Sequence, residues 1–93
     1  MITIEISDHN ALVLHDFLAR EIDGRKAARL AAAIEHPAEF WALNAVHCSL
    51  EATLAEPLAE NYRGLVAAAR GQVIAESDPD GTFGPIGGEA GAA

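Results

Sequence analysis

Four histidines and one cysteine are the side chains in this sequence best suited to metal or nucleophilic chemistry. On a regular helix the adjacent His47 and Cys48 point about 100 degrees apart, so they cannot ligate one ion together. His36 and His47 share a direction but would lie about 16 Å apart along the helix axis. His9 and His15 also diverge, and the chain has no His-x-x-x-His or Cys-x-x-Cys spacing, so we predict no metal ligands within one copy. A site shared between two copies is the metal arrangement that these spacings leave open.

Carboxylate pairs are the second chemical possibility, because acid–base catalysis of glycoside hydrolysis uses two acids that face a pocket. Glu35 and Glu39 have the i, i+4 spacing of one helix face, and so do Glu56 and Glu60. Both pairs stand at expected helix starts, where negative charge stabilises the helix dipole, so capping is the stronger interpretation. Ser49 follows the histidine–cysteine pair, but no third group is spaced to orient a base for it. We therefore predict no catalytic residues, no cofactor and no enzyme activity.

An apolar pattern between residues 40 and 69 gives the strongest fold signal. Apolar side chains recur every three or four positions in two runs, which Glu56-Pro57 separates. The first run consists of Phe40, Leu43, Val46, Leu50 and Leu54, and the second of Tyr62, Leu65, Val66 and Ala69. Each helix thus has one apolar face that must be covered, and the sequence predicts that the two helices form an antiparallel hairpin.

Alternation of apolar and polar residues predicts a short strand at the N-terminus, with Ile2, Ile4 and Ile6 on its buried face. A strand needs a backbone partner on at least one edge. A second copy of the same strand is the partner that we favour. Residues 82–86 and a strand of another protein are the alternatives.

Capping residues set the expected helix boundaries. Ser7-Asp8 offers an N-cap for a first helix, and Gly24 suits the left-handed position just past its end. The alanine-rich residues 25–34 favour a second helix. Pro37 fits the first turn of a third helix that ends near residue 55, and Asn61 can cap a last helix that ends near residue 76.

These elements give a mainly α fold: a short N-terminal β-strand followed by about four helices, the last two an antiparallel hairpin. We expect one helical domain over residues 1–76 and a tail rich in Gly, Pro and acidic residues over 77–93, in which Phe83 and Ile86 are the large apolar groups. Gly64 and Gly71 share one side of the last helix. They either admit another backbone or leave that face exposed.

Size and charge restrict the partners. A chain of 93 residues forms one domain with a modest core, which favours homodimerisation. Its net charge of −8 repels nucleic acid phosphates, so we expect no nucleic acid partner. The lone Cys48 and an N-terminus without signal-peptide character predict a cytoplasmic protein, and no apolar run is long enough for a membrane span. Most of the six cations cluster between Arg20 and Arg29, where a solvated helix face is favoured and a local anion contact stays open.

Four large side chains are candidates for partner contacts: Trp41, Tyr62, Phe83 and Ile86. Trp41 flanks the apolar stripe that Phe40 begins, which favours a place at the edge of the core or in a dimer contact.

Several short motifs resemble those of a family of small, acidic, uncharacterised bacterial proteins. They are Glu39-Phe40-Trp41-Ala42-Leu43-Asn44, Leu50-Glu51, Glu56-Pro57 and Asn61-Tyr62, in that order, after a strand-and-helix start. The resemblance covers residues 2–74, whereas residues 25–34 and the Gly-rich tail have no counterpart in it. It implies a compact helical domain and, because the role of that family is unknown, no particular function.

The best functional hypothesis from sequence is a noncatalytic protein–protein interaction domain that forms a homodimer. Its acidic surface suits a basic protein partner, as in immunity proteins, antitoxins and small inhibitors. An accessory subunit of a larger enzyme complex is the first alternative. The second is a small-ligand-binding helical protein, with the ligand in a gap lined by Phe17, Trp41 and Tyr62.

Overall fold

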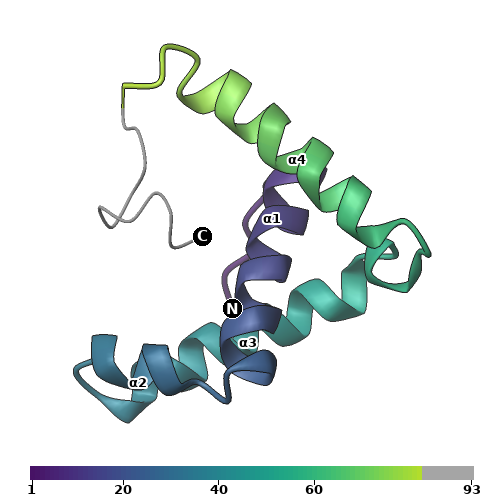
Figure 1. Ribbon diagram of the computed structural model, residues 1–93. Coiled ribbons are helices and arrows are strands. Elements are labelled where there is room, and N and C mark those ends of the chain that lie inside the picture. The colour runs from purple at the N-terminus through teal and green to yellow at the C-terminus, as the bar shows by residue number, and fades with distance from the viewer. Residues whose placement is uncertain (83–93) are drawn as a thin grey trace.

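The computed structural model describes residues 1–82, apart from the side chain of Glu56, and these residues are mainly helical as the sequence predicts (Figure 1). In chain order the elements are α1 (Asp8–Leu18), the π-helical turn η1 (Ala19–Gly24), α2 (Ala28–Ala33), α3 (Pro37–Thr53), the 3-10 turn η2 (Glu56–Leu58) and α4 (Tyr62–Ser77). Residues 83–93, which include Phe83, Ile86 and most of the predicted tail, lie outside the described residues.

The predicted N-terminal strand is not seen: residues 1–7 form no regular element. Ile2, Ile4 and Ile6 are 88%, 74% and 47% exposed, and no backbone hydrogen bond joins residues 1–6 to another described residue. The physical reason is that a strand exists through its ladder of hydrogen bonds, and the described part of one chain supplies no second strand. Residues 2–6 therefore have the alternating sequence of a strand but are not paired with another strand in residues 1–82.

The first helix begins as predicted and ends differently. The Ser7 hydroxyl accepts a hydrogen bond from the backbone N–H of Asn10 at 3.3 Å, so Ser7 is the N-cap. Past Leu18, however, the chain continues as a π-helical turn through Gly24 instead of stopping before it. The left-handed conformation falls on Lys26 (φ 51°) and Ala27 (φ 60°), where the chain reverses into the short helix α2.

The hairpin of the last two helices is also not formed. α3 starts at Pro37 as predicted, but α3 and α4 diverge from η2, and each packs on α1 (Figure 1). α1 is thus the central helix of the fold. The sequence pattern identified both apolar faces, yet an apolar face does not specify which helix covers it.

The core consists of two clusters on opposite sides of α1. Between α1 and α3 it contains Ala11, Leu18 and Leu50, with Leu14, Ile22, Leu43 and Leu54 packed against them. Between α1 and α4 it contains Leu12, Val66 and Ala69, with Val13, Tyr62 and Leu65 around them. The α4 stripe is therefore confirmed. In the α3 stripe Leu43, Leu50 and Leu54 also pack in the core, but Val46 is 41% exposed and the neighbouring His47, 2% exposed, is buried in its place.

The outer side of α4 is open. A Cβ atom built on Gly64 or on Gly71 would meet nothing within 4 Å, so no other described backbone approaches these glycines. None of the helices in residues 1–82 has the length and apolar content that crossing a bilayer requires.

Candidate functional site

A pair of buried histidines lies where α1 and α3 meet. The rings of His15 and His47 have centroids 5.4 Å apart and planes inclined by 34°, and the two residues are 4% and 2% exposed. Tyr62 of α4 stands edge-on to His15, with centroids 6.5 Å apart. The sequence prediction compared histidines along single helices and so missed a pair formed between two helices. His47, which the apolar pattern of the sequence did not include, is buried between α1 and α3.

Carboxylates flank one member of the pair. The Nε2 atom of His47 lies 3.2 Å from Oδ2 of Asp23 and 3.3 Å from Oε1 of Glu51. Carboxylate oxygens only accept hydrogen bonds, so the neutral tautomer that fits has its proton on Nε2. In that tautomer Nδ1 of His47 is an acceptor, and it has no partner among the described groups.

The other member of the pair, His15, lacks a hydrogen-bond partner within residues 1–82. Neither ring nitrogen of His15 has a hydrogen-bond partner among the described groups. Burial lowers the pKa of His15 below its ordinary 6.5, and the nearby His47 lowers it further, while Glu51, Asp16 and Asp23 offset part of the effect. His15 is therefore held in its neutral form.

The histidine pair offers little chemistry of its own. Within residues 1–82 no cluster of three or more His, Cys, Asp or Glu side chains is arranged to hold a metal ion. Cys48 is exposed, and its sulfur lies 3.9 Å from the amide nitrogen of Asn44 rather than beside a base. His15 and His47 are too buried to meet a substrate directly.

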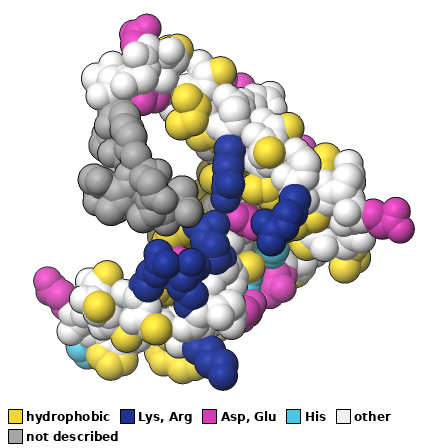
Figure 2. Space-filling model, viewed as in Figure 1, with side chains coloured by type: hydrophobic (Ala, Val, Ile, Leu, Met, Phe, Trp, Pro, Cys, Tyr) yellow, Lys and Arg dark blue, Asp and Glu magenta, His cyan; other side chains and the backbone are white. Residues whose placement is uncertain are grey.

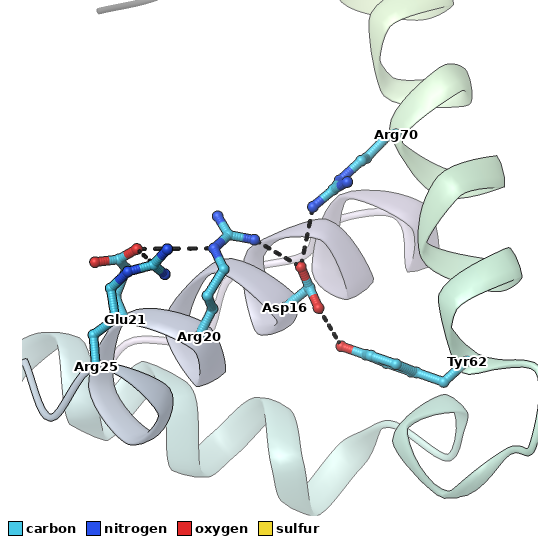
Figure 3. Close-up of polar contacts among 6 residues, drawn as sticks. All are labelled: Asp16, Arg20, Glu21, Arg25, Tyr62 and Arg70. Carbon is cyan, nitrogen blue, oxygen red and sulfur yellow. Dashed lines mark hydrogen bonds and ion pairs between the residues drawn. The ribbon is translucent and has the colours of Figure 1, made fainter. Parts of the chain in front are cut away.

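A polar network joins α1 to α4 around Asp16, as Figure 3 shows. Oδ1 of Asp16 accepts a hydrogen bond from the Tyr62 hydroxyl at 2.9 Å. Oδ2 accepts one from Arg20 at 2.9 Å and another from Arg70 at 3.2 Å. Burial and the bond to Asp16 raise the pKa of Tyr62 to about 12. The network fixes the positions of two guanidinium groups that come from different helices.

A second ion pair extends this network along α1 and η1. Glu21 is 4% exposed, and its Oε2 atom lies 3.1 Å from Nη1 of Arg25 and 3.8 Å from Nε of Arg20. Its other oxygen, Oε1, is buried without a described hydrogen-bond partner. Two of the cations that the sequence placed on a solvated face, Arg20 and Arg25, thus pair with acidic groups of neighbouring residues.

An open cavity of about 550 Å³ lies beside the Asp16 network. Its apolar lining comes from Ile6, Val13, Leu14 and Phe17, and its polar lining from Asn10, Arg20 and Arg70. Arg20 also lies over the Phe17 ring, 5.7 Å from the ring centroid. The cavity therefore has an apolar wall and a rim of hydrogen-bond donors.

The residues predicted for partner or ligand contacts do not converge. Trp41 is 64% exposed, stands edge-on to Phe40 at 4.9 Å, and lines a separate apolar cavity of about 280 Å³ between α2 and α3. Phe17 lines the larger cavity, and Tyr62 binds Asp16. The gap between Phe17, Trp41 and Tyr62 is therefore not formed, and Phe83 and Ile86 lie outside the described residues.

Comparison with models of known protein families, with curated proteins and with solved structures finds no match to this chain. The resemblance to small acidic bacterial proteins thus stays a prediction. Function has to be argued from the geometry of the chain itself.

Proposed function

We propose that this chain is a noncatalytic interaction protein that forms a homodimer by pairing its N-terminal segment, residues 1–6, with the same segment of a second copy. One observation supports this most: Ile2, Ile4 and Ile6 are exposed on a segment whose backbone has no described partner. Large apolar groups arranged with a period of two are costly to leave in water and suit a strand interface.

Pairing of the two segments would bury the isoleucines and would also give the backbone of residues 1–6 hydrogen-bond partners. Full burial of one isoleucine stabilises by about 1.5–3 kcal/mol, and six such side chains meet when two copies associate about a twofold axis. Two strands alone are marginal in water, so the isoleucines must also cover a helix. Ile6 already lines the cavity beside α1, which gives the paired segments a surface to rest on.

The test compares two substitutions on opposite faces of the segment. Ile4→Asp places a charge inside the proposed interface, whereas Thr3→Asp adds the same charge on the other face. We expect the wild-type protein and Thr3→Asp to be dimers by size-exclusion chromatography with light scattering, and Ile4→Asp to be a monomer. Amides of residues 2–6 should resist hydrogen exchange in the dimer alone. A wild-type chain that stays monomeric up to its solubility limit would refute the dimer.

We further propose that the dimer binds a basic protein in the cytoplasm, in the manner of immunity, antitoxin or inhibitor proteins. The support is the net charge of −8, since charge complementarity accelerates encounter and suppresses wrong partners. Cys48 is a free, exposed thiol, which fits a reducing compartment. Affinity for such a partner should fall as salt concentration rises, and salt-independent binding would contradict this part of the proposal.

An accessory subunit of a larger enzyme complex is the second candidate, because the cavity beside Trp41 is apolar and open. Its lining consists of Ala27, Ala31, Ile34, Pro37, Phe40 and Trp41. An enzyme docked here would bury Trp41, so its fluorescence would shift to shorter wavelength in the complex. Trp41→Ala should then abolish recovery of that enzyme from the native cell while leaving the dimer intact.

A further inference from the structure

The cavity beside the Asp16 network has the composition of a small-ligand site. Its volume of about 550 Å³ is in the range usual for pockets that hold small molecules. One wall is apolar, and Phe17 and Ile6 remain 39% and 47% exposed on it. A hydrocarbon group placed against these two side chains would remove both from water, which is the main source of affinity in such pockets.

The rim of the cavity selects the charge of the ligand. Arg20 and Arg70 approach Asp16 from η1 and α4 and meet at the same oxygen, so one carboxylate holds two guanidinium groups side by side (Figure 3). These three groups have a net charge of +1, and the adjacent Glu21–Arg25 ion pair adds no net charge. The hydrogen bonds to Asp16 use one N–H of each guanidinium, which has five. The remaining donors can bind a second anion.

The wider charge distribution has the same sign. Although the chain is acidic, its Lys and Arg side chains gather over α1, between α4 and α2, on the face shown in Figure 2. A local positive field at this place attracts a small anion, whereas the total charge of −8 still opposes a long polyanion.

We propose that this cavity binds a small monocarboxylate with an apolar body, such as a medium-chain fatty acid. Its carboxylate contacts Arg70 and Arg20, because guanidinium groups match the two oxygens of a carboxylate. Its hydrocarbon chain lies against Phe17 and Ile6. Asn10 offers a further polar group at the rim, and its amide nitrogen already donates to Ser7 at 2.7 Å.

This site differs from every ligand site that the sequence predicted. The sequence left open an anion contact between Arg20 and Arg29, and the structure adds Arg70 from a distant part of the chain. It also separates Phe17 from Trp41 and Tyr62. Ile6 belongs to both proposals, but Phe17, Arg20 and Arg70 lie outside residues 1–6, so variants at these positions test the ligand site separately from the dimer.

The experiment uses octanoate as the probe and octanol as its uncharged match. Isothermal titration calorimetry gives the affinities, and chemical-shift changes in NMR spectra locate the site. We expect octanoate to bind the wild-type protein at least tenfold more tightly than octanol, with the largest shifts at Val13 and Phe17. A tenfold ratio corresponds to the loss of about one hydrogen bond to a charged group.

Two arginines on the same helix provide a matched pair of variants. Arg70→Gln removes a guanidinium from the cavity, and Arg63→Gln makes the same charge change at an exposed position that does not line it. We expect Arg70→Gln to weaken octanoate binding about tenfold with little effect on octanol, and Arg63→Gln to have no effect. Equal losses in both variants would mean a nonspecific charge effect and would refute the site.

A further variant tests the apolar wall in case Arg70→Gln disturbs folding. Phe17→Ala should weaken octanoate and octanol by the same factor, because it removes hydrocarbon contact and leaves the arginines in place. Melting curves show whether each variant is folded. Octanoate that fails to bind, that binds no better than octanol, or that shifts the signals around Trp41 instead would overturn the proposal.

Discussion

The two sides of α1 differ in how their buried polar groups are paired. Toward α4, Asp16 accepts hydrogen bonds from Tyr62, Arg20 and Arg70, so the polar groups that cross this interface are matched. Toward α3, both nitrogens of His15 and one of His47 are buried without a described partner. The apolar parts of the two interfaces are similar in kind, because each centres on a few aliphatic side chains.

This difference in hydrogen bonding indicates that the α1–α3 interface is the weaker of the two. A buried donor or acceptor without a partner costs about 1–3 kcal/mol, since it loses its bonds to water and gains none. The α1–α3 interface carries this cost and the α1–α4 interface does not. We therefore expect α3 to separate from α1 before α4 does, and amides of α3 to exchange hydrogen faster than those of α4.

The largest change in stability is expected from a substitution that breaks the hydrogen bonds between α1 and α4. Asp16→Ala removes the acceptor of Tyr62 and of two arginines, so the free energy of unfolding should fall by about 1–3 kcal/mol. Urea unfolding measures the loss. Asp80→Ala is the control, because it removes an exposed carboxylate outside the helices and should change stability little.

The same substitution has a spectroscopic signature. Without Asp16 the pKa of Tyr62 should fall from about 12 toward its ordinary 10.0, which an ultraviolet titration detects. The raised pKa means that the contribution of Tyr62 to stability is complete below pH 10 and is lost as the pH rises through 12. Asp16→Ala should weaken this alkaline dependence, while the part that burial causes should remain. An unchanged Tyr62 titration would show that the hydrogen bond is not made in solution.

Local chemistry explains what the sequence could predict. Ser7 and Pro37 identified two helix starts, because a cap and a fixed φ act on adjacent residues. The apolar face of α4 was also correct, since Val66 and Ala69 are buried. The prediction of an N-terminal strand was wrong for the converse reason. A strand needs a partner strand for its hydrogen bonds, and the alternation of apolar and polar residues supplies no partner.

Contacts between distant residues explain what the sequence could not predict. Arg70 and Tyr62 reach Asp16 across most of the chain, and no spacing rule joins them. His47 was overlooked because the apolar pattern counted Val46 in its place. A signal was available, since Leu43, His47, Leu50 and Leu54 also follow helical spacing. The search for a helical period counted apolar residues only, however, so it did not include a histidine.

A smaller change in stability is expected from a substitution that removes the unpaired polar groups between α1 and α3. His15→Phe replaces a ring without polar partners by an apolar one, so stability at pH 7 should rise by about 1 kcal/mol or less. The lowered pKa of His15 means that its contribution is complete above pH 6.5 and is lost as the pH falls through the folded value. The titratable groups around His15 are His47, Glu51, Asp16 and Asp23, together with Tyr62, whose ring stands edge-on to it.

Urea unfolding of His15→Phe and wild type at several pH values checks this prediction. The gain from the substitution should grow below pH 6.5, because the unfolded wild-type chain takes up a proton there and the folded chain does not. A loss of stability at pH 7 would show that His15 makes a hydrogen bond in solution, and the two sides of α1 would then be equally well paired.

The last effects concern a surface that is part of neither interface, and they should be comparable in size to that of His15→Phe. Gly64→Ala and Gly71→Ala add a methyl group on α4 where nothing lies within 4 Å, so each should raise the free energy of unfolding by about 0.5–1 kcal/mol through helix propensity alone. The two glycines lie about 10 Å apart along α4, so their effects should add.

The glycine substitutions should also be insensitive to pH, unlike His15→Phe, because no titratable group takes part. Urea unfolding of the two single variants and the double variant at pH 5.5 and 7 tests both points. A variant that lost stability, or whose effect depended on protein concentration, would mean that a second copy packs its backbone against this side of α4. A concentration-dependent effect would move the dimer interface from residues 1–6 to α4, because none of residues 1–82 of the single chain fills the space over these glycines.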